Sequence, residues 1–179
     1  RLGEMQCLPE LRCLFVYRNG IHDADHGGGT RPCPAWKRSD AGDKPDLLAY
    51  AREAGRQAVK LAQMEHMRPS DLVTKESFEN AILVHAAISG STNCLLHIPA
   101  IAHEFGIEIT GDTFDRLHRN ARYLLDVRPA GRWPAECFYY AGGVPAIMEE
   151  IKDHLHLDVM TVTGKTLGEN LAELRENGF

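Results

Sequence analysis

The sequence predicts an α/β fold that is mainly helical, with one or two short strands, and three observations support this prediction. Apolar residues recur at helical spacing in several separate stretches between residues 46 and 175. Strand-like patterns are confined to residues 124–127 and 158–163. Glycine and proline mark the breaks between these stretches. The chain has 179 residues, of which 44% are hydrophobic and 25% charged, and this composition is typical of a globular domain.

The charge and hydropathy patterns exclude several classes of partner. The formal net charge is −5 and the basic residues are scattered, so we expect no binding to nucleic acid or to an anionic membrane surface. No apolar run has the length of a transmembrane helix, and residues 1–30 lack the features of a secretory signal. We therefore expect a cytoplasmic location.

The cysteines do not form a recognisable framework. There are five of them, an odd number without a CxxC pair, which argues against a disulfide scaffold and against a zinc ribbon. They stand at Cys7, Cys13, Cys33, Cys94 and Cys137. The spacing of the first three matches no ferredoxin-like run, so we interpret all five as thiols.

Residues 1–45 differ from the rest because glycine and proline interrupt every periodic pattern. One group here has the residue types of a metal site. His22 and His26 flank Asp23 and Asp25, and these four side chains are suited to a divalent metal. A glycine-rich loop provides no helix to fix their spacing, so the sequence favours a flexible polar loop.

From Asp46 onward the pattern predicts helices. Asp46 is suited to cap the first of these helices. Its inner face is expected to consist of Leu47, Ala51, Ala54, Ala58, Leu61 and Ala62. Gly55 inside this helix costs about 1 kcal/mol relative to alanine, so we expect it to pack closely against a neighbour. Pro69 ends the helical region, and Ser70 or Thr74 begins the next helix.

The remaining helices are expected to include residues 94–105, 113–121, 144–151 and 167–175. Pro99 lies inside the first of these and should kink it. A turn at Gly164 should lead into the last. The tripeptide Gly164-Lys165-Thr166 suggests a phosphate loop, but Val159 stands where that motif requires glycine. The phosphate-loop motif is therefore absent.

A polar turn, residues 89–93, joins two of the expected helices. We place Gly90 in the left-handed position that ends the first helix, and expect Ser91 or Thr92 to cap the second. Both helices are predicted to be buried, so the turn should point amide groups into the interior. Such a helix start favours a carboxylate or phosphate, and the side chains of Ser91, Thr92 and Asn93 can bind a polyol. None of these side chains titrates near neutrality, so we expect binding rather than proton transfer; the residues alone favour a simple capped turn.

Five ordered motifs resemble the dihydroxy-acid and sugar-acid dehydratase family. They are Glu76-Ser77-Phe78-Glu79-Asn80-Ala81, Gly90-Ser91-Thr92-Asn93, Leu96-His97-Ile98-Pro99-Ala100-Ile101-Ala102, Ala141-Gly142-Gly143-Val144-Pro145 and Thr161-Val162-Thr163-Gly164-Lys165-Thr166-Leu167-Gly168-Glu169-Asn170-Leu171. Residues 84–87 and 95–103 are most similar to the bacterial D-xylonate dehydratase branch. Ser89 departs from the family, which usually has a second glycine there. The resemblance covers residues 46–179 as a partial domain, incomplete at both ends, and leaves residues 1–45 as a non-matching, irregular segment.

The resemblance implies a lyase that removes water from a sugar acid such as D-xylonate and gives the 2-oxo-3-deoxy acid. In this family an iron–sulfur cluster acts as Lewis acid, a magnesium ion holds the carboxylate, and a serine in a later domain removes the α proton. Neither the residues that bind the cluster and the magnesium ion in this family nor the catalytic serine maps onto this chain. The resemblance assigns substrate binding to Gly90, Ser91, Thr92 and Asn93, and the full-length enzyme is expected to form a homo-oligomer.

Two other functions remain open at this stage. The chain is expected to come from the middle of a larger N-terminal α/β domain, with exposed apolar faces, rather than to be a self-sufficient unit. A non-catalytic remnant or interaction module on the same scaffold fits this expectation as well as an enzyme does. A metal-dependent hydrolase using His22, Asp23, Asp25 and His26 is a more distant alternative.

Overall fold

A computed structural model describes residues 46–90, 92–127 and 131–176 of the chain. The predictions for residues 1–45, including the His22–His26 group and the first three cysteines, lie outside the described residues, as does Ser91. The described helices are α3 (Asp46–Gln63), α4 (Pro69–Leu72), α5 (Lys75–Ala87), α6 (Cys94–Glu104), α7 (Gly111–Asn120), α8 (Ala135–Tyr140), α9 (Gly143–Glu150), the 3-10 helix η1 (Lys152–His154) and α10 (Leu167–Glu176).

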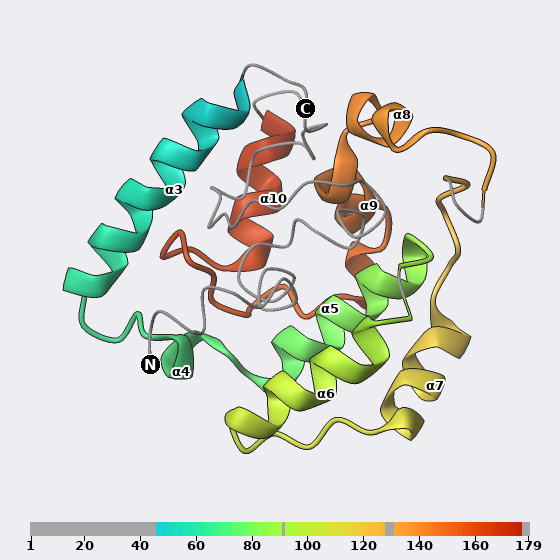
Figure 1. Cartoon of the computed structure of the whole chain (residues 1–179), viewed down its shortest axis with the longest axis horizontal. Coiled ribbons are helices and arrows are strands. Elements are labelled where there is room, and N and C mark those ends of the chain that lie inside the picture. Colours follow the sequence, from blue (N-terminus) through green and yellow to red (C-terminus); the bar gives the residue numbers. More distant parts are fainter. Residues whose placement is uncertain (1–45, 91, 128–130, 177–179) are drawn as a thin grey trace.

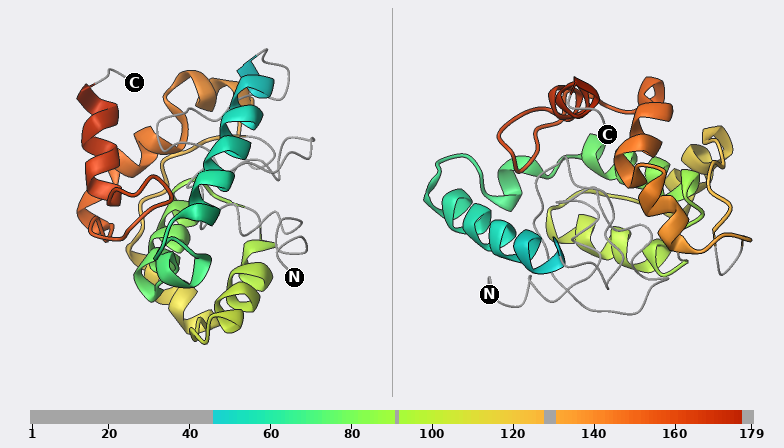
Figure 2. Two further views of the ribbon diagram at one scale, coloured as in Figure 1. Left: turned by 90° about the vertical axis from the view of Figure 1, so that its left-hand side faces the viewer. Right: turned by 90° about the horizontal axis from the view of Figure 1, so that it is seen from above.

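Helix α5 lies in the middle of this arrangement (Figure 1), and Figure 2 shows α6 on one side of it and α9 with α10 on the other. It contacts α7 and α9. Thr74 caps it, as predicted: its hydroxyl accepts a hydrogen bond from Ser77 N at 3.2 Å, while Ser77 Oγ accepts one from Thr74 N at 3.0 Å. Its fully buried apolar residues are Phe78, Ile82 and Ala87, and Ile88, which follows the helix as its C-cap, is also buried.

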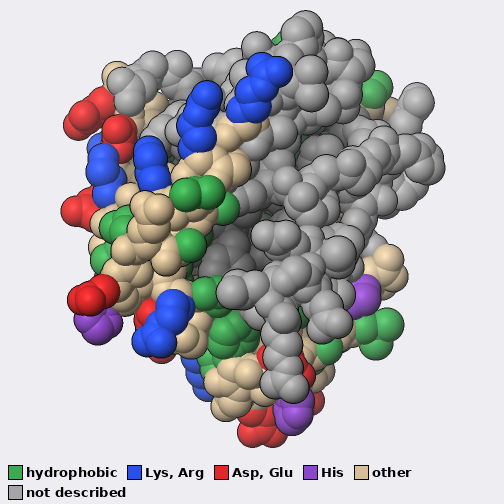
Figure 3. All heavy atoms as spheres, turned by 60° about the vertical axis from the view of Figure 1, so that its left-hand side comes forward, with side chains coloured by type: hydrophobic (Ala, Val, Ile, Leu, Met, Phe, Trp, Pro, Cys, Tyr) green, Lys and Arg blue, Asp and Glu red, His purple; other side chains and the backbone are tan. Residues whose placement is uncertain are grey.

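Helix α3 lies along one edge of the molecule, and the expected break follows it, with Pro69 at the first position of α4. The expected close packing at Gly55 is wrong, because Gly55 is exposed and an added Cβ would meet nothing within 4 Å. The outer side of α3 carries basic side chains (Figure 3). Gln57 ties the helix to the C-terminal region, since its Nε2 donates to Val162 O at 2.8 Å.

The mainly helical fold class is confirmed, and the two strand-like stretches are shorter than expected. Within the described residues, each contributes one isolated bridge, Val127 with Trp133 and Met160 with Thr166. Gly164 forms the predicted turn with a φ of 79°, and α10 follows it. None of the helices in the described ranges is long and apolar enough to cross a membrane.

Large apolar side chains are exposed on several elements, as expected for this chain. Among the residues that the structure describes, Leu96 on α6 is the most exposed of them, at 72%. The others are Val59, Met64, Leu95, Tyr123, Leu124, Trp133, Tyr140, Leu157 and Met160.

Glu79 on α5 joins three parts of the fold through an ion pair with Arg116 and a contact with His156. Arg116 Nη2 on α7 donates to its Oε1 at 2.9 Å, and His156 Nε2 lies 3.0 Å from its Oε2. Burial raises the pKa of the Glu79 carboxyl, but the hydrogen bonds with Arg116 and His156 outweigh burial and hold this pKa below its ordinary value. The ionised carboxylate therefore stabilises the fold.

Replacing Glu79 by glutamine should lower the free energy of unfolding by about 1 kcal/mol near neutral pH. The folded-state pKa is lowered, so this contribution is present above the ordinary glutamate pKa of about 4.3 and is lost as the pH falls through the lowered value. Urea unfolding of both chains between pH 7 and pH 3 checks this. Glu104→Gln, at an exposed position on α6, is the control, and an equal loss at all pH values would contradict the electrostatic account.

Candidate functional site

The polar turn leaves α5 through a motif with two crossed hydrogen bonds. Ser89 N donates to Ala86 O at 3.2 Å and Gly90 N donates to His85 O at 2.9 Å, which is the Schellman pattern. The left-handed residue in this pattern is Ser89, with a φ of 54°. The prediction that Gly90 takes this conformation is therefore wrong by one position. The left-handed position is the one at which the resemblance gives the family a glycine.

Replacing Ser89 by glycine should raise the free energy of unfolding by about 1 kcal/mol, because a side chain in the left-handed region costs roughly that amount and glycine avoids the cost. Ser89 is exposed, so the change removes little packing. Urea unfolding of the two chains measures the difference. Ser70→Gly, at an exposed position in the short helix α4, is the matched control and should destabilise.

Position 90 requires glycine for a different reason, which is the lack of space for a side chain. A Cβ built on Gly90 would lie 2.3 Å from His85 Cδ2 and 2.9 Å from His85 Nε2. These distances are well below van der Waals contact, and both atoms belong to a ring with few alternative positions. Glycine at this position therefore lets the turn lie directly against the imidazole of His85.

The turn enters α6 without the predicted cap. The N-cap residue is Asn93, which has helical backbone angles and makes no side-chain cap hydrogen bond, whereas Ser91 or Thr92 was expected there. Leu95 N donates to Thr92 O at 3.1 Å, so a tight turn precedes the helix. Thr92 and Asn93 are exposed, and the prediction that the turn points into the interior is wrong for these two residues. Both residues therefore lie on the surface at the positive end of α6.

A pair of histidines beneath the turn was not recognised from the sequence. His85 Nδ1 on α5 lies 3.4 Å from His118 Nε2 on α7, and the two rings stack with centroids 5.3 Å apart. Burial, and then the nearby His85, lower the pKa of His118, while Asp115 raises it. His118 is therefore neutral at physiological pH. The only signal in the sequence was the position of His85 on the apolar face of a helix.

No metal site is formed by the part of the chain that the structure describes, since no three histidine, cysteine, aspartate or glutamate side chains lie together there. The thiol of Cys94 is buried at the start of α6 and that of Cys137 is exposed. The described residues therefore do not fit an iron–sulfur cluster or a magnesium ion, and we assign them no step that involves one. The hydrolase site at His22 lies outside these ranges and stays a prediction, tested by loss of zinc or manganese binding in His22→Ala.

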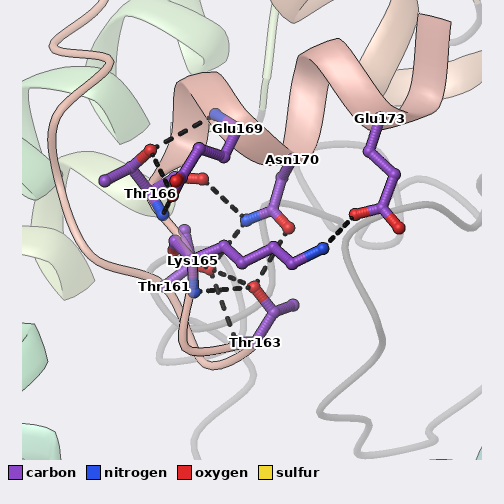
Figure 4. Close-up of polar contacts among 7 residues, drawn as sticks. All are labelled: Thr161, Thr163, Lys165, Thr166, Glu169, Asn170 and Glu173. Atoms are coloured by element: carbon purple, nitrogen blue, oxygen red, sulfur yellow. Dashed lines mark hydrogen bonds and ion pairs between the residues drawn. The ribbon is translucent and has the colours of Figure 1, made fainter. Parts of the chain in front are cut away.

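A second polar cluster lies at the start of α10 (Figure 4). Asn170 is 2% exposed. Its Nδ2 donates to Thr161 Oγ1 at 2.8 Å and to Thr166 O at 2.9 Å, while its Oδ1 accepts from Thr163 Oγ1 at 3.0 Å. Thr161 Oγ1 donates in turn to Lys165 O at 2.8 Å. These groups bind one another, so the cluster holds its own loop rather than a ligand.

The residues that suggested a phosphate loop are part of this cluster. Glu169 supplies the anion at the start of α10, because its Oε2 accepts hydrogen bonds from Thr166 N at 2.7 Å and Thr166 Oγ1 at 2.9 Å. Lys165 Nζ pairs with Glu173 at 2.6 Å. A carboxylate of the chain itself thus takes the place that a phosphate would need.

The chain belongs to the dihydroxy-acid/6-phosphogluconate dehydratase family, because a model of the N-terminal domain of that family matches residues 38–170. Dihydroxy-acid dehydratase 1 of Methanosarcina acetivorans is 49% identical over 127 residues, which are 71% of this chain and 23% of that protein. The dihydroxy-acid dehydratase of Caldicellulosiruptor bescii is 46% identical over 177 residues, 98% of this chain and 29% of that protein. The chain therefore spans less than a third of the length of these relatives. The match also extends upstream of Asp46, the residue at which the resemblance was expected to begin.

Proposed function

We propose that this chain is part of a hydro-lyase that removes water from a 2,3-dihydroxy carboxylic acid. Such a reaction takes a proton from C2 and a hydroxide from C3, and the resulting enol becomes the 2-oxo-3-deoxy acid. The observation that supports the proposal is the family match over residues 38–170. The whole enzyme is further proposed to be a cytoplasmic homo-oligomer.

The polar turn is proposed to bind the substrate. Thr92 offers a hydroxyl and Asn93 a carboxamide, both exposed, at the first turn of the 11-residue helix α6. Hydroxyl and amide groups can pair with the hydroxyls of a sugar acid, and the helix start favours its carboxylate. Gly90 and Ser91 complete the proposed binding set. None of these groups adds a charge that would compete with the acid.

The ligands of the iron–sulfur cluster and of the magnesium ion that the resemblance implies are proposed to lie outside this chain, together with the proton acceptor. When bound, these groups would stabilise the departing hydroxide and the developing enolate. The described side chains do not fit them, so the contribution proposed for this chain is binding and orientation. The 179-residue chain alone should then show no measurable dehydration.

The substrate within this class is proposed to be a sugar acid such as D-xylonate. This proposal is supported by the sequence of residues 84–87 and 95–103, which resembles that of the D-xylonate dehydratase branch. A chimera provides the test: the Caldicellulosiruptor bescii dihydroxy-acid dehydratase carries residues 46–176 of this chain in place of its aligned segment. Formation of a 2-oxo acid is measured with D-xylonate, 6-phosphogluconate and a branched 2,3-dihydroxy acid. A higher kcat/KM for D-xylonate than the parent shows supports the sugar-acid proposal.

The alternative is a non-catalytic remnant of the same scaffold. Iron and sulfide analysis of the chimera after anaerobic reconstitution separates the two. A chimera that binds a full cluster and turns over a dihydroxy acid supports the enzyme. One that folds, binds the cluster and is inactive with all three acids supports the remnant.

Replacing Asn93 by alanine in the chimera should lower kcat/KM about tenfold to a hundredfold, because one lost substrate hydrogen bond costs roughly 1–3 kcal/mol. Cluster content and folding should not change. The matched control is Glu104→Gln at the other end of α6, which should leave kcat/KM intact. If Asn93→Ala keeps full activity, or loses its cluster as well, the turn is only a structural connection.

A further inference from the structure

The imidazole of His85 fills the space beside Gly90 that a side chain would otherwise take. His85 is 7% exposed, and its Cδ2 lies 2.3 Å from the position that a Gly90 Cβ would have. The backbone of the same two residues is joined, because Gly90 N donates to His85 O at 2.9 Å. His85 thus contacts the polar turn through both its backbone and its ring.

Helix α7 fixes this ring from the opposite side. His118 Nε2 lies 3.4 Å from His85 Nδ1, and the rings of the two histidines are inclined by 23°. Phe114 meets His85 edge-on at a centroid distance of 6.5 Å and His118 at 5.7 Å. Three aromatic rings from two helices therefore form a block on which the turn rests.

We propose that His85 is a positioning residue for substrate binding, because its ring, held by His118 and Phe114, sets the place of the turn through Gly90. This inference rests on the proposed function of the turn. The turn needs such a support, since Ser89 is held in the left-handed conformation at a φ of 54° and its neighbours Thr92 and Asn93 are exposed. A displacement of about 1 Å in a binding group lowers catalytic efficiency strongly.

The contact itself is tested in the 179-residue chain, without any activity. Gly90→Ala should raise the unfolding equilibrium constant at least about tenfold, because the new methyl group meets the ring. In a His85→Ala background the same change should raise it less than about threefold, since the ring is gone. Amide NMR shifts of Thr92 and Asn93 should move in Gly90→Ala and in His85→Ala. Additive effects of the two substitutions would overturn the proposed contact.

The functional part is tested in the chimera through separate KM and kcat values. His85→Ala should raise KM about tenfold while kcat per folded enzyme stays within about twofold, because the turn binds substrate rather than moves protons. His85→Phe keeps the ring and should retain most of the affinity, whereas His85→Asn keeps a polar group but not the ring and should not. A purely structural role would reduce the yield of folded enzyme without a rise in KM, and that result would overturn the proposal.

Failure of the proposed function and failure of the positioning role of His85 give different results. A chimera with the unmodified segment that shows no dehydration contradicts the proposed function, while the mutant cycle in the isolated chain still decides whether His85 holds the turn. An active chimera whose KM is insensitive to His85→Ala contradicts only the positioning role.

Discussion

Replacing Asn170 by alanine should lower the free energy of unfolding by about 3 kcal/mol. The side chain is 2% exposed and makes three hydrogen bonds, to Thr161, Thr163 and Thr166. Its loss removes all three bonds at once, and a hydrogen bond contributes about 1 kcal/mol net to stability. The small cavity left behind adds to this cost.

Urea unfolding of the 179-residue chain measures this effect, and hydrogen exchange shows where it acts. The amide of Thr161, which donates to Lys165 O at 3.0 Å, should exchange faster in the variant. Thr163→Val also removes the hydroxyl contacts with Thr161 Oγ1 at 2.9 Å and Lys165 N at 3.3 Å, but it should cost less, because Thr163 is only half-buried and Asn170 keeps two of its three bonds. Lys165→Met removes only an exposed ion pair with Glu173 and should change stability by less than about 1 kcal/mol. Equal losses in all three variants would contradict a role specific to Asn170.

The helices could be predicted from the sequence because their signals are local. Pro69 was predicted to break the helical region and Thr74 was one of two predicted helix starts, and both signals depend only on a few neighbouring residues. The two strands were predicted less accurately, because a strand requires a pairing partner and the sequence does not show whether one is present. Met160 finds a single bridge with Thr166, and the chain then turns at Gly164.

The candidate site was predicted in part. The polar turn joins two helices as expected, and its role in substrate binding stays a prediction. Residue preference placed the left-handed conformation at Gly90, but α5 ends one residue earlier, so that Ser89 takes it. The packing of His85 against Gly90 could not be foreseen, because the ring is held by His118, which is 33 residues away. Contacts of this kind depend on how helices pack rather than on local sequence.

Asn80 provides a second long-range contact, and its replacement by alanine should lower the free energy of unfolding by about 2–4 kcal/mol. The side chain is fully buried and binds both backbone groups of His156. Asn80 Nδ2 donates to His156 O at 2.9 Å, and His156 N donates to Asn80 Oδ1 at 2.8 Å. The carboxamide thus replaces a strand partner for the segment after η1, across 76 residues of chain.

Removing this side chain should also loosen the contact between Glu79 Oε2 and His156 Nε2, because the backbone of His156 is no longer held against α5. Asn80→Ala should therefore reduce the additional effect of Glu79→Gln, and the two substitutions should not be additive. Urea unfolding of both single variants and the double variant measures the coupling. Asn120→Ala, which removes an exposed bond from Asn120 Nδ2 to Arg116 O at 3.0 Å on α7, serves as the control and should cost less than about 1 kcal/mol. If Asn80→Ala costs no more than Asn120→Ala, the His156 segment is held by its apolar contacts and not by the carboxamide.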